Sequence, residues 1–464
     1  MKRYLFCKLS LGITLAFIFA SCGDDDSPQL DDDSSISAFV FESLDPDVEG
    51  TISGTNITAT VPNATDVTSL APTITIADKA KVAPASGLAQ DFSSPVKYMV
   101  TAEDASQSTY TVTVTVKDAP KLMASAVWEK TLANGGLPSW FTANGERDLA
   151  VSGTLLYVTN NNDKIQILSA ADGSIQTSAG SGTGANKGFL DGKQNFASGN
   201  LRLANVGIDN NGVIVGSNLR VGDGTNPWNV YNWDSNTSNQ ELLFSYTPAQ
   251  GVRMGDNMTI VGSVTGEGFI YAAGHGTRKI FRFGIAGGTV NTTPAEITLQ
   301  NNDITALGNA PDVNPVSDAS DANIIVTGTE IGLSEYTSAG VLVGTLPDAL
   351  NAGDTAPLFA FALDVKPFEL SNRKVIATTA TDFTGGNNAD GGWLYLIDYT
   401  DGWENLTNGN IIRMAFTPNG NIDTNLNGTG GVDVVVNNAG DQATVYAIIS
   451  NFGIAAYNIS FDNL

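Results

Sequence analysis

Two residue types that carry much of enzyme and metal chemistry are scarce in this chain. It has 464 residues but only 2 cysteines, Cys7 and Cys22, and 1 histidine, His275. Because both cysteines lie near the N-terminus, a chain that begins at Cys22 has no disulfide, no zinc–thiolate site and no cysteine nucleophile. A metal site with several histidines is excluded, and a catalytic dyad or triad based on histidine would have to use His275.

Carboxylates are the remaining candidates for catalysis. A glycoside hydrolase needs two of them about 5–10 Å apart. Asp148, Asp163, Asp256 and Asp364 qualify by residue type, but nothing in the sequence singles out a pair. His275 could serve as the lone base of a polysaccharide lyase. A carbohydrate-active enzyme is therefore an alternative to a binding protein rather than the main expectation.

One segment partly matches a calcium-binding loop. Asp423, Asn425 and Asn427, followed by Gly428, fit the first six positions of the D-x-N-x-N-G pattern. The twelfth position of that loop, which should be glutamate, is Val434. Asn-Gly turns of similar composition are common in β-proteins. The segment therefore predicts either a calcium site or an ordinary turn, and no other cofactor is expected.

The charge balance limits the partners. Acidic residues outnumber basic ones by 48 to 23, which gives a formal net charge of -25. Such a surface repels nucleic acid and anionic lipid, so no nucleic-acid partner is expected. It also disfavours highly sulfated or polyuronic glycans unless cations bridge them.

The elements that would position these residues are short strands. Thr73–Ile76 and Tyr110–Val116 alternate apolar residues with threonine, which places the apolar set on one face of a strand. Residues 36–118 have the size of one Ig-like β-sandwich. The sequence therefore predicts an all-β chain that begins with this sandwich.

Residues 122–464 contain a repeat that predicts a β-propeller. In its clearest unit four short strands follow one another, which is the pattern of one blade. These strands are Asp148–Val151, Leu155–Val158, Lys164–Leu168 and Ser174–Thr177. The turn before the outermost strand recurs near Asp172, Ser235, Gly287, Ala339 and Asp401.

The two ends of the repeat predict how the ring closes. The last stretch offers three strands, and Ala124–Leu132 could supply the fourth. That pairing would remove exposed sheet edges. We expect about six blades, with five or seven also compatible. A β-helix is the main alternative, but its repeats would be shorter and more regular.

One face of such a propeller would carry the candidate ligand-binding residues. The loops before each innermost strand and between the second and third strands share that face. The residues placed there are Trp140, Phe141, Asn160, Asn161, Asp163, Trp228, His275, Arg278, Trp393 and Asn451. An indole can stack on a sugar ring while amides bind its hydroxyls, so the set predicts a glycan platform. The alternative is that each tryptophan fills a gap between blades.

Three arginines also fall near this face. Arg147, Arg202 and Arg253 each precede a predicted innermost strand in consecutive blades. They could bind a carboxylate or another anion. The alternative, which we favour from the acidic composition, is that they pair with acids such as Asp148 and Asp256 and hold the blades together.

The N-terminus predicts secretion. Lys2 and Arg3 precede an apolar stretch from Leu9 to Ala20, which is too short to span a membrane comfortably. Residues 1–21 are therefore expected to be a signal peptide, and residues 22–35 an acidic flexible tether.

Several short motifs resemble those of Bacteroidota surface lipoproteins. Phe19-Ala20-Ser21-Cys22 resembles a lipobox, which implies lipidation of Cys22, although Phe19 replaces the usual leucine. Gly23-Asp24-Asp25-Asp26 resembles the surface-export signal of these lipoproteins, and an ordinary acidic linker on a periplasm-facing lipoprotein is the alternative. Tyr98–Asp104 with Tyr110–Val114 resembles their Ig-like N-terminal modules. The propeller part resembles a Bacteroidota domain family of unassigned function.

The whole layout resembles surface glycan-binding proteins of SusC/SusD-type polysaccharide-utilisation systems. That resemblance implies a protein anchored in outer-membrane lipid at the cell surface. It implies a non-catalytic role in binding polysaccharide or oligosaccharide for nutrient uptake, with a SusC/SusD-type transporter as a partner. The alternatives are a glycoside hydrolase or lyase on a propeller scaffold, or a protein-partner subunit of an outer-membrane transporter.

Overall fold

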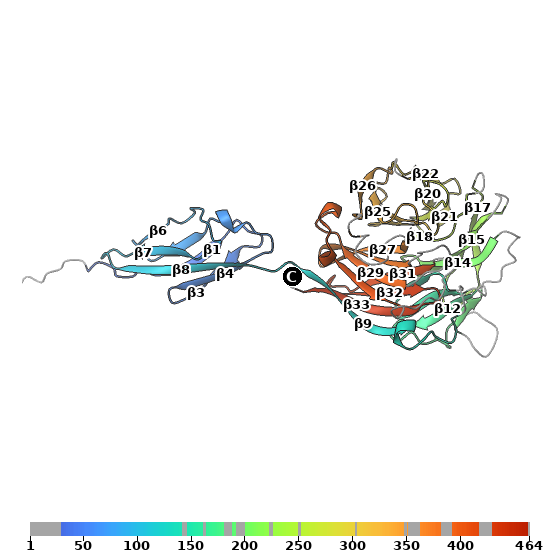
Figure 1. Cartoon of the computed structure of the whole chain (residues 1–464), viewed down its shortest axis with the longest axis horizontal. Coiled ribbons are helices and arrows are strands. Elements are labelled where there is room, and N and C mark those ends of the chain that lie inside the picture. Colours follow the sequence, from blue (N-terminus) through green and yellow to red (C-terminus); the bar gives the residue numbers. More distant parts are fainter. Residues whose placement is uncertain are drawn as a thin grey trace, which may run out of the picture. The chain divides into compact units, whose positions relative to one another are not determined.

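The chain divides into two compact units between Ala119 and Pro120 (Figure 1). The computed structural model describes residues 29–141, 146–160, 164–180, 188–191, 200–221, 226–248, 252–301, 304–347, 350, 362–381, 392–416 and 429–462. Both units are built from β-strands, which confirms the predicted all-β class. Within these ranges, no helix is long and apolar enough to cross a membrane.

The N-terminal unit is a sandwich of two sheets. One sheet has the order β2 (Val48–Glu49), β1 (Ile36–Phe41), β5 (Thr73–Ile76). The other has the order β3 (Thr51–Ser53), β4 (Asn56–Val61), β8 (Gln107–Val116), β7 (Val96–Thr101), β6 (Lys81–Ala83). Alternate residues of β4 are buried, as a period of two predicts. Phe39 and Phe41 of β1 pack edge to face, 5.4 Å apart, in a core shared with Tyr98 of β7.

The second unit contains six sheets in chain order. Blade 1 is β10 (Leu149–Ser152), β11 (Leu155–Asn160), β12 (Lys164–Ser169) and β13 (Phe189–Asp191). Blade 2 is β14 (Asn200–Ile208), β15 (Ile214–Arg220), β16 (Trp228–Trp233) and β17 (Glu241–Tyr246). Blade 3 is β18 (Thr259–Gly262), β19 (Gly268–Ala273), β20 (Lys279–Ala286) and β21 (Thr289–Val290), with β22 (Ala295–Thr298) also on β20.

The remaining sheets repeat the same antiparallel order. Blade 4 is β23 (Asp312–Pro315), β24 (Ile324–Thr327), β25 (Ser334–Tyr336) and β26 (Leu342–Thr345). Blade 5 is β27 (Ala362–Leu370), β28 (Arg373–Thr381), β29 (Gly392–Asp398) and β30 (Ile411–Ala415). Blade 6 is β31 (Gly430–Val436), β32 (Ala443–Ile449), β33 (Gly453–Asp462) and β9 (Lys121–Thr131).

The first strands of the six sheets form the inside of a ring. β10 contacts β14, β14 contacts β18, β23 contacts β27 and β27 contacts β31. Blade 3 reaches blade 4 through β19 and β23, and β31 returns to β10. The described strands therefore form a six-bladed propeller, in agreement with the predicted count of about six.

The ring is closed by strands from both ends of the unit. β9 pairs antiparallel with β33 from Lys121 opposite Asp462 to Thr131 opposite Gly453. This confirms the prediction that the segment around residues 124–132 supplies the fourth strand of the last blade. The pairing covers the edge of β33 and ties the first strand of the unit to its last.

The predicted outer strand of blade 1 is wrong. Ser174–Thr177 forms no strand, and Ile175 makes only an isolated bridge with Leu168. The fourth strand is β13, which pairs Leu190 with Ile165. The reason is burial, because Leu190 is 0% exposed in the blade whereas Ile175 stays 40% exposed.

Aspartates of the inner strands join neighbouring blades. Asp148 accepts hydrogen bonds from its own neighbour Leu149 at 2.7 Å and from the Val206 amide of blade 2 at 2.9 Å. Asp364 does the same with Val365 at 2.8 Å and with Val432 of blade 6 at 2.6 Å. Each carboxylate therefore satisfies backbone donors of two blades at once.

The same device, or a close variant, occurs at the other four junctions of the described ring. These bonds run from Val151 N to Asp433 (2.9 Å), from Val264 N to Asp209 (2.9 Å), from Val365 N to Asp312 (3.1 Å), and from the Thr259 hydroxyl to the Val313 carbonyl (2.8 Å). A side-chain-to-backbone bond therefore spans each junction.

Replacing one of these carboxylates should destabilise the propeller. Asp364→Ala leaves the Val365 and Val432 amides without that acceptor inside the protein, and we expect a loss of about 2–4 kcal/mol in unfolding free energy. Tryptophan fluorescence during urea unfolding measures this selectively, because all 6 tryptophans lie in the second unit. The exposed Asp321→Ala is the control, and equal midpoints for the two variants would contradict the role given to Asp364.

Candidate functional site

The mouth of the propeller is the edge of the ring where the inner strands begin. Three of the predicted ligand-binding residues lie there, because each ends or follows the second strand of its blade: Asn160, His275 and Asn451. The His275 amide donates to the Arg253 carbonyl at 3.1 Å, just before β18. The Ser450 amide donates likewise to Thr429, just before β31, at 3.1 Å. The structure therefore brings these three positions to one edge.

Asn160 belongs to the wall of the mouth rather than to its surface. Its side chain is 3% exposed, and its amide donates to Glu146 at 3.4 Å. The Ser450 hydroxyl donates to the Glu146 carbonyl, which links blade 6 to the segment that enters blade 1. The predicted ligand contact of Asn160 is therefore not supported, because its amide faces the protein.

Trp228 is a second correction. It is 0% exposed, and its indole N–H donates to the Ser217 hydroxyl at 2.8 Å. Its ring lies 5.6 Å from Phe244 of blade 2 and 5.6 Å from Phe283 of blade 3. Trp228 fills the gap between two blades and has no face to offer a ligand, so the alternative named for the tryptophans holds here.

Trp140 and Phe141 remain candidates. They lie in the loop that leads from β9 to the inner strand of blade 1, with ring centres 4.8 Å apart. Both side chains are half-buried against the core that blades 1 and 6 share. A half-buried aromatic pair on such a loop presents a rigid apolar edge to solvent.

Trp393 makes a cation–π contact with Arg413. It begins the third strand of blade 5, and the Arg413 guanidinium lies 4.4 Å from its ring centre. Its ring packs on the core of blades 4 and 5, and the core of blades 5 and 6 separates this core from the one behind Trp140. Trp140, Trp228 and Trp393 thus pack against three separate cores, so the structure does not gather them into one platform.

Arg278 occupies the turn between β19 and β20 but is directed outward. Its guanidinium donates to the Asn301 carbonyl, beyond β22, at 2.9 Å. Several other predictions lie outside the described residues. These are Asn161, Asp163, the calcium candidates Asp423, Asn425 and Asn427, the lipidation site Cys22 with residues 1–28, and the side chain of Arg202.

A group of charged residues lies at the mouth between blades 1 and 3. The Arg253 guanidinium donates to Asp256 at 2.9 Å, which is the pairing with a nearby acid that we favoured for these arginines. Burial and the positive charge of Arg253 lower the pKa of His275, which leaves its imidazole neutral at neutral pH. Burial also lowers the pKa of Arg147, with the charge of Arg253 adding to the effect and that of Asp256 opposing it.

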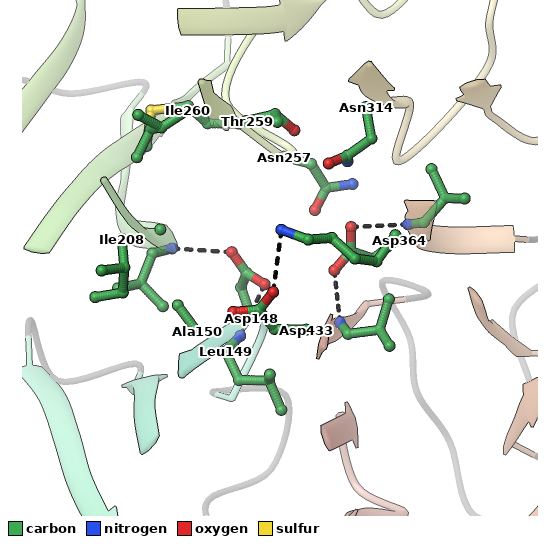
Figure 2. A pocket seen from close by; sticks show the side chains of 16 residues that line it. Asp148, Leu149, Ala150, Ile208, Asn257, Thr259, Ile260, Asn314, Asp364 and Asp433 are labelled. Carbon is green, nitrogen blue, oxygen red and sulfur yellow. Dashed lines mark hydrogen bonds and ion pairs between the residues drawn. The ribbon is translucent and has the colours of Figure 1, made fainter. Parts of the chain in front are cut away.

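Beneath the mouth a cavity of about 60 Å³ occupies the axis of the ring. All six inner strands, or the residues just before them, contribute to its lining. Figure 2 shows Asp148, Asp364 and Asp433 pointing toward one another from blades 1, 5 and 6, with Asn257 opposite. The Lys366 ammonium pairs with Asp433 at 3.0 Å.

Burial alters the protonation of this cluster. Removal from water raises the pKa of Asp148 to about 8, although its two backbone donors oppose the shift. Burial and the charges of Asp312 and Asp148 raise the pKa of Asp364 well above its ordinary value. The Asp312 and Asp364 side chains also interact with each other, which adds to the rise in the pKa of Asp364 and opposes the rise in the pKa of Asp312.

The oxygens of these carboxylates are used by the fold. Asp312 and Asp364 are in direct contact, whereas a glycoside hydrolase holds its two acids about 5–9.5 Å apart around the sugar. Among the described residues no three His, Cys, Asp or Glu side chains could hold a metal ion. The carboxylate oxygens of Asp148, Asp312 and Asp364 accept hydrogen bonds from backbone amides.

Sequence reasoning missed part of this cluster. The sequence indicates Asp148 and Asp364 as candidate acids, but it does not indicate Asp312, Asp433 or Lys366. The signal was present as an aspartate followed by leucine or valine at the inner strand. It recurs in Asp148-Leu149, Asp312-Val313, Asp364-Val365 and Asp433-Val434.

Residues 36–114 match the family model described as SGBP, N-terminal, the N-terminal domain of surface glycan-binding proteins. The chain is similar to Bacteroidota surface glycan-binding proteins. The match covers the sandwich that Tyr98–Asp104 and Tyr110–Val114 predicted, and it confirms that resemblance. The comparison with curated proteins found no match.

Solved structures support the fold of this SGBP-like chain. A DUF4623 family protein from Bacteroides eggerthii is 16% identical with a TM-score of 0.53, and the match covers 93% of this chain and 99% of that one. The likeness at this identity concerns the fold alone. The WD40 domain of SCAP from fission yeast is 10% identical with a TM-score of 0.31, and the match covers 78% of this chain and 92% of that one.

The raised pKa values predict that the protein is more stable in mild acid than in mild base. A carboxyl whose pKa is higher in the folded than in the unfolded chain contributes stability that is complete below its ordinary value of 3.8. That contribution is lost as the pH rises through about 8. We expect the unfolding free energy to fall by at least about 2 kcal/mol between pH 5 and pH 9.

Asp312→Asn is the variant that tests the interaction between Asp312 and Asp364. An amide can donate to Asp364 at every pH, so the variant should show a flatter dependence of unfolding free energy on pH than the wild type. The exposed Asp321→Asn should keep the full slope. A wild-type protein whose stability rises from pH 5 to pH 9 would show that these carboxyls are not held protonated.

Proposed function

We propose that this chain is a lipid-anchored, non-catalytic protein of the outer-membrane surface that binds a polysaccharide or oligosaccharide at the mouth of its propeller. The observation that carries the proposal is the match of residues 36–114 to the SGBP N-terminal domain. Cys22 would carry the lipid and the acidic stretch after it would serve as a tether. The sandwich would then act as a spacer between membrane and propeller.

The described part of the mouth supplies groups suited to sugar. The Trp140–Phe141 pair and the indole of Trp393 offer apolar faces for the C–H side of a sugar ring. His275 and Asn451 lie at the same edge of the ring and carry polar side chains. Because the indoles of Trp140 and Trp393 pack on different cores, we expect two separate contact points on an extended glycan rather than one stacked platform.

A protein partner is a second role, compatible with the first. Three consecutive large apolar residues are exposed at the outermost strand of blade 4: Val341 just before β26, and Leu342 and Val343 on it. Exposed apolar side chains on an edge strand favour contact with another protein. The partner implied by the resemblance is a SusC/SusD-type transporter.

Substitution of the two mouth tryptophans tests the glycan proposal. In affinity electrophoresis against a panel of polysaccharides, we expect the wild type to be retarded by at least one polymer. Trp140→Ala and Trp393→Ala should each weaken the interaction at least about fivefold, because each removes an aromatic contact of about 1 kcal/mol.

Trp128→Ala is the matched control, because Trp128 packs on the same core as Trp140 but belongs to β9, the outermost strand of blade 6. Near-ultraviolet circular dichroism checks that each variant is folded. Lack of retardation by any polymer would count against glycan binding. If both mouth variants are retarded as strongly as the wild type, the binding site lies away from these two tryptophans.

A further inference from the structure

Arg147 differs from the other arginines whose side chains the structure describes. Its Nε atom is buried and has no hydrogen-bond partner. Arg253 is paired with Asp256, and Arg373 with Asp398. The other described arginines donate to carbonyls (Arg220, Arg278 and Arg282) or stack on Trp393 (Arg413). A buried guanidinium nitrogen without an acceptor is costly, so the unpaired Nε of the half-buried Arg147 requires an explanation.

Other polar atoms around the mouth are also buried without a hydrogen-bond partner. The Nδ1 atom of His275 in blade 3 is buried without a hydrogen-bond partner. The same is true of the hydroxyls of Thr327 in blade 4 and of Thr379 and Thr381 in blade 5. These threonines are 0%, 0% and 2% exposed, and they lie at or near the ends of second strands, at the edge that His275 occupies.

The contrast with the channel below is informative. There the buried carboxylates of Asp148, Asp364 and Asp433 each accept two backbone hydrogen bonds. The polar groups of the channel are therefore used by the fold, whereas several polar groups of the mouth are not. Of these residues Arg147 and His275 are only half-buried, so a polar ligand at the mouth could complete their hydrogen bonding.

We infer that the mouth binds a sugar that carries a carboxylate, and that the half-buried Arg147 guanidinium pairs with that carboxylate beside His275. The inference rests on the proposed function and names the ligand class of the same site. A guanidinium forms charge-assisted, two-pronged hydrogen bonds with a carboxylate, which a neutral hydroxyl cannot match.

The charge of the chain restricts this class. A net charge of -25, with Asp256 and Glu330 close to His275, repels a polymer that is acidic at every residue. The ligand expected is therefore a mostly neutral glycan with isolated uronic acids, in which one carboxylate meets Arg147.

Matched pairs of oligosaccharides test the inference by isothermal titration calorimetry. Each pair consists of a neutral oligosaccharide that carries one uronic acid and the same molecule with that carboxyl reduced to an alcohol. We expect the wild type to prefer the acidic member at least about tenfold. Arg147→Gln should remove that preference and leave the affinity for the reduced member within about twofold, and Arg147→Lys should restore part of it.

Arg282→Gln is the control for net charge, because it removes one positive charge from the third strand of blade 3, away from the mouth. It should leave both affinities unchanged. Equal affinity of the wild type for the two members, or equal losses in the Arg147 and Arg282 variants, would overturn the inference. If only neutral polysaccharides bind, this inference fails while the proposed function stands. If no glycan of either kind binds, both fail.

Discussion

The bond between an inner-strand aspartate and the backbone of the next blade is the constraint on which the propeller depends. An innermost strand has no further strand beside it, so its free N–H groups face a narrow, largely desolvated axis and need acceptors. Asp148, Asp364 and Asp433 supply them, each to its own strand and to the following blade. The raised pKa values of Asp148 and Asp364 reflect the cost of keeping carboxyls there.

A ring fixed in this way gives the mouth its geometry. The loops that reach the mouth begin or end on strands whose registers are set by the same junctions, so residues from blades 1, 3, 5 and 6 keep fixed mutual positions. Two kinds of polar group are thereby separated in space. The carboxylates of the channel accept hydrogen bonds from backbone amides. At the edge, by contrast, Arg147, His275 and the threonines each have a buried polar atom without a hydrogen-bond partner.

The sequence predicted the features that depend on local periodicity. The period of two in Tyr110–Val116 indicated the sandwich, and the missing strand at the end of the repeat indicated that residues 124–132 close the ring. Features that depend on tertiary packing were not predictable in the same way. Trp228 begins its strand where a mouth residue would be expected, but its side chain points into the gap between blades. The outer strand of blade 1 likewise depended on whether Ile175 or Leu190 could be buried. The role of the inner-strand aspartates depends on backbone amides of the neighbouring blade, and the sequence does not show which amides lie beside them.

Hydrogen–deuterium exchange of the protein with and without a bound glycan tests most directly whether the mouth is the binding site. The account predicts slower exchange on binding in peptides that cover residues 146–160, 270–279 and 447–453, with no change in residues 36–114. Protection confined to the sandwich, or to outer strands such as β17 and β26, would contradict it.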